Sequence, residues 1–356
     1  MTYLLKPLSW LYGGVTGLRN WLFDHGVLPQ EEFEIPVVSV GNITVGGTGK
    51  TPHVEYILAN LSIDYKVAVL SRGYKRKTKG FVLANSLSTP QSVGDEPLQI
   101  YKKFGKNVKV AVCENRRKGI KELLKEFPDL ELIILDDAFQ HRYVKPKVSI
   151  LLMDFHRPIY EDNLLPLGRL RESIGQVGRA DMVIVTKCPE ELPPLEYRLV
   201  TKKLDLMPYQ SLYFSRYSYG ALVPVFQDDD PYNVSLSTLS RKDGVFLVTG
   251  IANPRPLVRH LRRYEFKVKV AHFGDHHDFS RDDINIIKER FNTLTGERKI
   301  IVTTEKDAMR LMYNPYFPPE LKKVIYYIPV NVRMEPGIEE GDFVADLRKA
   351  IEASEN

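Results

Sequence analysis

Residues 44–51, Thr-Val-Gly-Gly-Thr-Gly-Lys-Thr, constrain the fold of this chain more than any other stretch. The apolar run 35–40 precedes them and predicts a buried strand, and a helical pattern follows over residues 52 to about 61. Glycines between a strand and a helix let backbone N–H groups turn inward on an anion, an approach that a side chain would obstruct. The helix N-terminus adds free N–H groups and its dipole. The sequence therefore predicts a phosphate-binding loop.

Each position of this loop has an expected part in binding a nucleotide. Lys50 would reach the β- and γ-phosphates, and the Thr51 hydroxyl would bind Mg²⁺. The backbone at the other positions would surround the phosphates; these are Thr44, Val45, Gly46, Gly47, Thr48 and Gly49. The common motif has glycine at position 44, and the core here instead resembles the variant loop of partition ATPases and dethiobiotin synthetases. That class usually has lysine before the glycine pair, where this chain has Val45.

The composition indicates a globular chain with a mild excess of positive charge. Hydrophobic residues make up 43% and charged residues 27% of the 356 positions, and this length favours two domains. A net charge of +5 suits an anionic substrate or an anionic membrane surface and does not require nucleic acid, so we expect no nucleic-acid partner. Cys113 and Cys188 show no metal-ligand spacing, which fits a reducing compartment.

Residues 1–28 are apolar and aromatic, with Lys6 and Arg19 between the apolar positions. Glycines and charges interrupt the segment, so it is not a continuous apolar span of about 20 residues. Tryptophans and cations on an amphipathic helix suit the headgroup region of a membrane. The alternative is a helix packed on the body of the protein. We predict an amphipathic helix that associates with the membrane.

Strands and helices alternate along the first half of the chain. After the loop, the predicted strands are 66–71, 108–113, 132–137, 148–154 and 182–187. This spacing predicts an α/β fold with a mostly parallel, doubly wound sheet. A connector rich in proline and acidic residues at 188–194 ends the pattern, and a new strand begins at Gly244. We predict an N-terminal helix at 1–28, a nucleotide-binding domain at 29–205 and a smaller α/β domain at 206–356.

Polar residues that follow predicted strands are candidates for the site. Asp136 and Asp137 end an apolar strand, and such carboxylates hold or orient the Mg²⁺ that bridges nucleotide phosphates. Gln140 and His141 come next and would support the metal ligands or be hydrogen-bonded structural residues. Arg72 follows another strand, where doubly wound sheets bind ligands. It would contact a phosphate of the acceptor, unless it belongs to a solvated loop.

Two acid–base candidates remain open from the residues alone. Asp95 opens a helix, where a first-turn carboxylate favours the helix dipole, or it faces the active site as a base. In the run 275–278, Asp-His-His-Asp, adjacent histidines on an extended segment point opposite ways and rarely share one metal. A carboxylate that orients His276 would make it an acid–base group, and a polar surface loop is the alternative.

Thr186 and Lys187 come just after a predicted strand. A Thr-Lys pair in this place is typical of base-reading loops in GTPases. The aspartate expected two residues after the lysine is Pro189 in this chain. We therefore predict no guanine specificity.

These motifs stand in an order that resembles tetraacyldisaccharide 4′-kinase, the lipid A kinase family of Gram-negative bacteria. One glycine-rich loop would be weak evidence, whereas the ordered set is specific and extends over nearly the whole chain. The motifs occupy residues 44–51, 71–74, 94–97, 136–142, 170–172, 275–277 and 305–307. The chain departs from the family pattern at Ala138, where glycine is usual, and at Ser173, where proline is frequent.

The resemblance implies a kinase that uses ATP and Mg²⁺ to phosphorylate the 4′-hydroxyl of a tetraacyl glucosamine disaccharide 1-phosphate, the lipid A precursor. It implies a peripheral enzyme at the cytoplasmic face of the inner membrane, and we expect a monomer. Asp95 would be the general base in a dyad with His276, and Arg171 would lie near the transferring phosphate. Lys50 would hold the phosphates, while Thr51 and the acidic pair 136–137 would serve Mg²⁺.

Two other functions are compatible with parts of the sequence. A membrane-associated, partition-type ATPase or GTPase switch would hydrolyse nucleotide without a lipid acceptor. A phosphoesterase would use the histidines of 275–277 as metal ligands, but the further Asp and His ligands of such a site are not evident.

Overall fold

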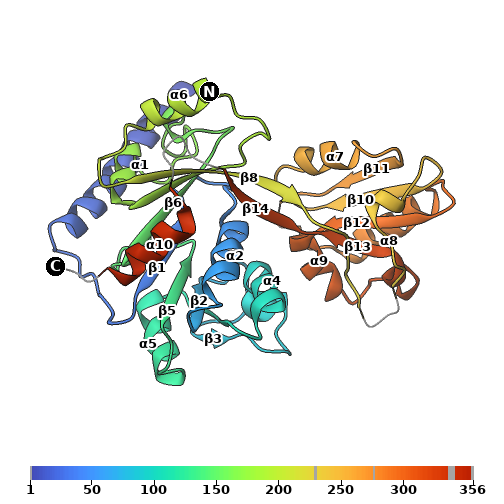
Figure 1. Cartoon of the computed structure of the whole chain (residues 1–356), viewed down its shortest axis with the longest axis horizontal. Helices are drawn as coiled ribbons and strands as arrows, with labels where there is room; N and C mark the ends of the chain where they lie inside the picture. Colours follow the sequence, from blue (N-terminus) through green and yellow to red (C-terminus); the bar gives the residue numbers. More distant parts are fainter. Residues whose placement is uncertain (1, 228–230, 276, 336–340, 354–356) are drawn as a thin grey trace. The chain divides into compact units, whose positions relative to one another are not determined.

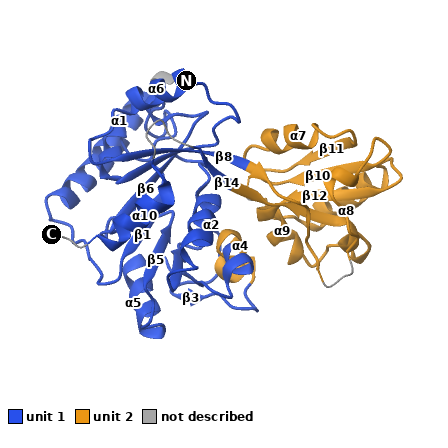
Figure 2. Cartoon of the chain, viewed as in Figure 1, with its two compact units in different colours: residues 1–88, 100–217, 332–356 blue, residues 89–99, 218–331 orange. Residues whose placement is uncertain are grey.

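The computed structural model describes residues 2–227, 231–275, 277–335 and 341–353 (Figure 1). The chain divides into two compact units, each with its own sheet (Figure 2). Unit 1 comprises residues 1–88, 100–217 and 332–356, and unit 2 comprises residues 89–99 and 218–331. The chain therefore enters unit 2 twice and returns to unit 1 each time. The domain limits given above remain a prediction.

Unit 1 is built on a nine-stranded sheet in the order β14-β8-β7-β6-β1-β5-β2-β4-β3. Neighbouring strands from β8 to β4 pair in parallel, and β3 is antiparallel to β4. The strands are β1 (Val37–Gly41), β2 (Val67–Ser71), β3 (Val82–Leu83), β4 (Lys109–Val112), β5 (Leu132–Asp136), β6 (Val148–Asp154), β7 (Met182–Thr186), β8 (Ser211–Tyr219) and β14 (Val330–Glu335). The predicted α/β fold with a large, mostly parallel sheet is confirmed.

Amphipathic helices pack against this sheet. Ile120 and Leu123 of α5 join one apolar cluster with Leu70 of β2, and Val200 and Leu204 of α6 join another with strands β6 and β7. The helices that lie wholly or partly in unit 1 are α1 (Thr2–Asp24), α2 (Lys50–Leu61), α4 (Asp95–Phe104), α5 (Arg116–Glu126), α6 (Pro194–Leu204) and α10 (Phe343–Glu352), with 3₁₀ turns at Ile159–Glu161 and Ile174–Arg179.

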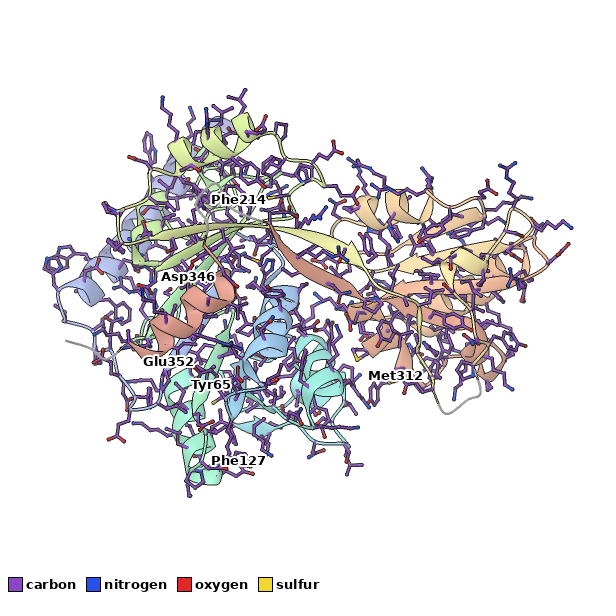
Figure 3. The ribbon with its side chains drawn as sticks, in the orientation of Figure 1. Tyr65, Phe127, Phe214, Met312, Asp346 and Glu352 are labelled. Carbon is purple, nitrogen blue, oxygen red and sulfur yellow. The ribbon has the colours of Figure 1, made fainter. Side chains whose placement is uncertain are left out.

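The C-terminal helix α10 returns to unit 1 and is fixed there by polar and aromatic contacts (Figure 3). The Tyr213 hydroxyl donates to Asp346 over 2.8 Å, and the Tyr65 hydroxyl donates to Glu352 over 2.5 Å. Phe343 packs edge-on against the Tyr213 ring at 5.1 Å between centroids. The last helix thus completes unit 1, although most of unit 2 precedes it in the sequence.

Helix α1 lies on unit 1 by one face only. Ser9, Asn20 and Phe23 are buried there, and the Ser9 hydroxyl donates to the Leu164 carbonyl over 2.9 Å. Arg142 closes this contact, because its guanidinium donates to Asp24 over 2.6 Å and stacks 5.0 Å from the Phe23 ring. Among the described residues, no helix has the length and apolarity needed to cross a membrane.

Unit 2 has a five-stranded sheet in the order β11-β10-β12-β13-β9. The pairs from β11 to β13 are parallel, and β9 is antiparallel to β13. The strands are β9 (Val223–Pro224), β10 (Gly244–Thr249), β11 (Lys267–His272), β12 (Lys299–Thr304) and β13 (Ile325–Ile328). The helices are α3 (Pro90–Val93), α7 (Arg255–Leu261), α8 (Arg281–Asn292) and α9 (Glu305–Met312), with 3₁₀ turns at Leu236–Thr238 and Pro319–Val324.

The end of β1 approaches the turn after β5 so closely that only glycine fits there. A Cβ atom on Gly41 would lie 2.7 Å from Cβ of Phe139 and 2.8 Å from its backbone nitrogen. Such distances are closer than van der Waals contact. This contact brings the start of the phosphate loop next to the acidic end of β5.

We predict that Gly41→Ala destabilises the protein by about 1–3 kcal/mol, because the added methyl group overpacks this contact. Urea unfolding would measure the change as a lower midpoint concentration. Gly17→Ala is the matched control: Gly17 lies inside α1, and an added Cβ would meet nothing within 4 Å. Alanine in a helix should stabilise by roughly 0.5–1 kcal/mol relative to glycine. Equal midpoints for Gly41→Ala and the unmodified protein would contradict the steric argument.

Candidate nucleotide-binding site

The phosphate loop connects β1 to α2 and ends at a glycine in the left-handed conformation. Gly49 precedes α2 and has a φ of 90°. A Cβ atom on Gly49 would also lie 1.8 Å from the Tyr217 hydroxyl oxygen. Both the backbone angle and the close neighbour therefore require glycine at this position. The predicted strand–loop–helix unit is present, with the loop in the expected place.

The start of α2 presents unused donors, as an anion site requires. No side chain caps this helix at Gly49. In the part of the chain that the structure describes, the amide N–H groups of Gly47, Gly49 and Lys50 donate to no protein acceptor. Free N–H groups and the helix dipole favour a phosphate at this point. Thr51, in the first turn, is largely buried.

The acidic pair lies beside this loop because β5 pairs in parallel with β1. The register places Asp136 opposite Val40, just before the loop begins. Asp137 follows with a φ of 48°, so the left-handed residue of this turn is Asp137 and not Ala138. Its Oδ1 lies 3.5 Å from Lys50 Nζ and 3.6 Å from a guanidinium nitrogen of Arg171.

The chemistry of this group fits Mg²⁺. Oδ1 of Asp137 is buried and accepts no hydrogen bond from the described residues, so it has capacity for a ligand. Two carboxylates and the Thr51 hydroxyl supply oxygen donors, which Mg²⁺ prefers, and Mg²⁺ needs only one or two protein carboxylates beside phosphate and water.

Gln140 connects the acidic turn to the phosphate loop. Its amide nitrogen donates to the carbonyl of Asn42 over 2.7 Å and to Glu172 over 3.3 Å. Its amide oxygen accepts from Arg171 at 3.4 Å. Asn42 in turn donates to the Thr48 hydroxyl over 2.7 Å, so one chain of hydrogen bonds joins both sides of the site.

The surroundings of His141 are strongly electropositive. Its Nε2 accepts from the backbone N–H of Arg116 at 3.3 Å. Burial, together with Arg116, Arg19, Arg117 and Arg72, lowers the pKa of His141 to about 4, so the ring is neutral at physiological pH. Arg72 itself is exposed at the end of β2. A region of this sign suits phosphate groups.

Side chains from the end of β7, from the residue after it and from α2 contact the carbonyl groups of the phosphate loop. Lys187 Nζ donates to the Gly47 carbonyl, and the Thr186 hydroxyl donates to the Thr48 carbonyl over 2.8 Å. His53 Nδ1 lies 2.7 Å from the Gly49 carbonyl oxygen, and its Nε2 lies 2.8 Å from the Ser215 hydroxyl. Burial lowers the pKa of His53 to about 4.

Asp95 lies in unit 2, at the start of α4, and forms an ion pair with Arg310 of α9. Arg310 also pairs with Asp307 at 3.0 Å, and Lys306 pairs with Glu96 at 3.0 Å. These contacts explain the proximity of the motifs at 94–97 and 305–307. His276 lies outside the described residues. Its neighbour His277 is 2.9 Å from Asp283.

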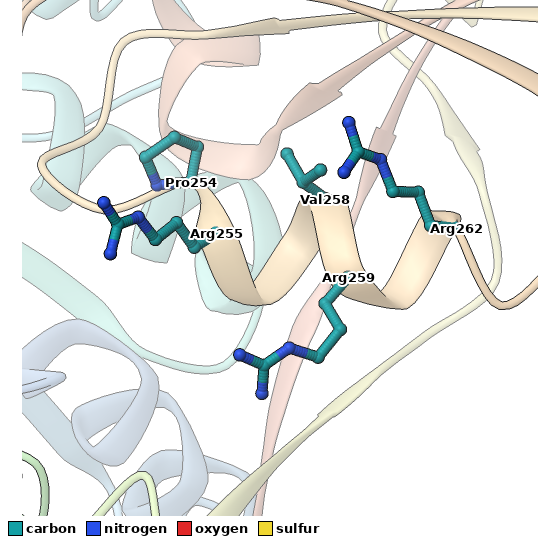
Figure 4. Close-up of a pocket in the computed structure, with 5 residues that line it drawn as sticks. All are labelled: Pro254, Arg255, Val258, Arg259 and Arg262. Carbon is teal, nitrogen blue, oxygen red and sulfur yellow. The ribbon is translucent and has the colours of Figure 1, made fainter.

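A shallow pocket of about 300 Å³ in unit 2 is lined mainly by residues of α7 (Figure 4). The lining residues are Pro254, Arg255, Val258, Arg259 and Arg262. The pocket offers cations and aliphatic carbon but no carboxylate or hydroxyl that would take a proton during catalysis. It is therefore not a candidate catalytic centre.

The structure thus groups most predicted unit 1 residues at one end of the sheet. Lys50, Asp137, Arg171 and Gln140 are joined by direct contacts. Several residues that bond to the phosphate loop, or to other residues of the site, were given no role from the sequence. They are Asn42, His53, Arg116, Asp154, Thr186 and Lys187. Of these, only Thr186 and Lys187 were marked by a motif, as a base-reading pair.

Comparisons with known proteins identify the family of this chain. The model of the family described as tetraacyldisaccharide-1-P 4′-kinase matches residues 1–352. A tetraacyldisaccharide 4′-kinase from Bacteroides thetaiotaomicron is 52% identical over 337 residues, covering 93% of this chain and 88% of the relative. One from Porphyromonas gingivalis is 45% identical over 336 residues, with 93% and 92% covered.

A solved structure gives the same result in three dimensions. The crystal structure of the "apo" form of LpxK from Aquifex aeolicus in complex with ATP aligns with a TM-score of 0.74. It is 29% identical, and the alignment covers 98% of each chain. The resemblance inferred from the order of the motifs is therefore confirmed, and the chain belongs to the tetraacyldisaccharide-1-P 4′-kinase family.

Proposed function

We propose that this protein transfers the γ-phosphoryl group of ATP to the 4′-hydroxyl of a tetraacyl glucosamine disaccharide 1-phosphate, a step in lipid A synthesis. The observation that carries the proposal is the meeting of Lys50, Arg171 and Asp137 at the phosphate loop. Phosphoryl transfer depends mainly on positioning and on stabilising negative charge, and this group supplies both. A partition-type switch is not favoured, because the matching family model and the relatives are tetraacyldisaccharide 4′-kinases.

The cations have separate tasks in this proposal. Lys50 and the free amide groups of the loop bind the β- and γ-phosphates. Arg171 stabilises charge on the phosphoryl group as it transfers, and Asp137 keeps both cations near their positions in the absence of nucleotide. Thr51, Asp136 and Asp137 would hold Mg²⁺, which would neutralise phosphate charge.

The acceptor hydroxyl needs a base because a sugar alcohol is a weak nucleophile. We assign this role to Asp95, acting with His276 as a dyad. Arg310 fixes the Asp95 carboxylate through their ion pair. Gln140, His141 and the exposed Arg72 are proposed to contact the acceptor, since an amide group, the N–H of a neutral imidazole and a guanidinium can all donate hydrogen bonds to a phosphate.

Helix α1 is proposed to bring the enzyme to the cytoplasmic face of the inner membrane, on an anionic surface. Its outward face carries large apolar side chains with 51–75% of their surface exposed; these are Leu8, Trp10, Leu11, Val15, Leu18 and Trp21. Its inward face touches site residues, because the Tyr12 hydroxyl donates to the Arg171 carbonyl over 2.9 Å and Arg19 donates to the Gln140 carbonyl over 2.9 Å. Acyl chains held by the membrane would therefore end beside the site.

We propose a monomer that binds no nucleic acid.

The direct test of the function is an assay with ATP, Mg²⁺ and the lipid disaccharide 1-phosphate in detergent. The product should gain the mass of one phosphate on the non-reducing sugar, with one ADP released for each acceptor consumed. ADP release at the same rate without acceptor would instead support a nucleotide switch.

Lys50→Ala should lower kcat about 100-fold or more, because the transferring phosphate loses a preorganised charge. The measurement is acceptor-dependent ADP release. Lys203→Ala is the matched control, since Lys203 is exposed on α6, where it pairs with Glu161 at 2.6 Å and lies 5.0 Å from the Tyr160 ring centroid. Near-native turnover in Lys50→Ala would remove the loop lysine from the mechanism.

Asp95→Ala and His276→Ala should each lower kcat by about 10²–10⁴-fold, the range for loss of a general base. The Kd for ATP should change little in either variant, because the proposed dyad acts on the acceptor. If the residues act as a pair, the double variant should be only slightly slower than either single variant. Losses that multiply would argue for two independent roles.

Leu11→Glu combined with Leu18→Glu should reduce binding to anionic phospholipid vesicles by about tenfold or more. Each change removes one leucine side chain that would be buried in the membrane on binding. Vesicle flotation measures the bound fraction. Leu87→Glu is the control, because Leu87 is 87% exposed and lies outside α1. Unchanged flotation of the double variant would place the membrane contact elsewhere.

A further inference from the structure

We propose that Lys187, Thr186 and His53 are positioning residues that hold three consecutive carbonyl groups of the phosphate loop, so that the amide groups of Gly49 and Lys50 face the nucleotide. We call these three residues the carbonyl clamp. They bind the carbonyl oxygens of Gly47, Thr48 and Gly49 in order. The inference rests on the proposed binding of ATP and adds residues that the loop motif does not contain.

The physical reason is the geometry of the peptide unit. The carbonyl and the N–H of one peptide point in opposite directions, because the unit is planar and trans. A side chain that fixes a carbonyl therefore also fixes the direction of the next N–H along the chain. In the part of the chain that the structure describes, the N–H groups of Gly49 and Lys50 donate to no protein acceptor. These two N–H groups belong to the peptides whose carbonyls Thr186 and His53 hold. The peptide that Lys187 holds carries the Thr48 N–H, which donates to the Gly46 carbonyl at 3.1 Å and so fixes the bend of the loop.

Each clamp residue is itself held in place, by a second contact or by burial. Lys187 Nζ is 2.8 Å from Asp154 Oδ2, at the end of the neighbouring strand β6. Asp154 also binds Arg157 at 3.0 Å, so its charge is shared between two cations. Thr186 is fully buried as the last residue of β7. Strand ends β6 and β7 thus support the loop from the side away from β5.

His53 is oriented by Ser215 of β8. A carbonyl oxygen only accepts, so His53 Nδ1 carries the proton that it donates to Gly49. Nε2 of the neutral ring then accepts from the Ser215 hydroxyl at 2.8 Å. This assigns the tautomer and gives Ser215 a role through His53. A phenylalanine ring would fill much of the same space but would neither donate to the Gly49 carbonyl nor accept from the Ser215 hydroxyl.

The carbonyl clamp explains the role of Thr186 and Lys187. This pair resembles a guanine-reading motif but lacks the aspartate that such a motif needs. In this chain the pair bonds to the backbone of the phosphate loop, 138 and 140 residues earlier. The clamp should therefore affect affinity for phosphates and not the choice of base.

The test uses Thr186→Val, which keeps the shape of the side chain and removes the hydroxyl donor. The Kd of the full-length protein for ATP, measured by calorimetry at fixed Mg²⁺, should rise about tenfold, since a buried carbonyl loses its partner. Thr186→Ser should restore binding to within about twofold. Thr201→Val is the matched control, because the Thr201 hydroxyl donates to the Tyr197 carbonyl inside α6 and does not touch the loop.

His53→Phe and Ser215→Ala extend the test to the third carbonyl. Both should raise the Kd for ATP, with the larger effect in His53→Phe, while the KM for the lipid acceptor stays unchanged. An unchanged Kd for ATP in Thr186→Val and His53→Phe would overturn the inference. Failure of Thr186→Ser to restore binding, or an equal effect in Thr201→Val, would also overturn it.

Failure of the clamp and failure of the proposed function give different results. If the unmodified protein binds ATP but phosphorylates no lipid acceptor, the kinase proposal fails, and the binding measurements still test the clamp. If acceptor phosphorylation is normal in every clamp variant at low ATP concentration, the clamp fails and the kinase proposal stands.

Discussion

The parallel pairing of β1 with β5 on one side and with β6 on the other is the constraint on which the site depends. Parallel strands end at the same edge of a sheet, so the residues that follow them meet there. The loop after β1 therefore receives carboxylates from the end of β5 and, through β6 and β7, the groups that hold its backbone. A shift of either pairing by one residue would turn alternate side chains to the other face and separate these groups.

The two sides of β1 contribute different chemistry. On the β5 side, Asp137 forms ion pairs with Lys50 and Arg171, and these contacts balance the charge of the two cations. On the β6 side, Asp154 holds Lys187, and the contacts of Thr186 and Lys187 with the loop concern the direction of its peptide groups. Carboxylates offset some of the cationic charge on both sides. The cations can therefore be concentrated near the loop without leaving it strained by mutual repulsion before nucleotide binds.

The parts of this arrangement that sequence could predict are those encoded locally. The apolar runs and the glycine motif each lie within a few residues, so the strand, loop and acidic strand end were found in their places. The ion pair of Asp95 with Arg310 spans 215 residues, and the contact of His53 with Ser215 spans 162. No periodicity marks such contacts, because either residue alone also fits a surface or core position. Thr186 and Lys187 were visible as a motif, but their partner at the loop was not.

Helix α1 shows why burial has to be judged face by face. Its polar side is buried on unit 1, where Asn20 donates to Glu172 over 3.0 Å, whereas its tryptophans are exposed. A helix that only packs on the protein would normally bury its apolar side and expose its polar side. In α1 the packed face and the apolar face are different, so the helix packs on unit 1 and still leaves its apolar side exposed. The same helix carries the exposed apolar surface and donates from Tyr12 to the backbone carbonyl of Arg171. A membrane in contact with α1 would therefore lie one helix away from the site.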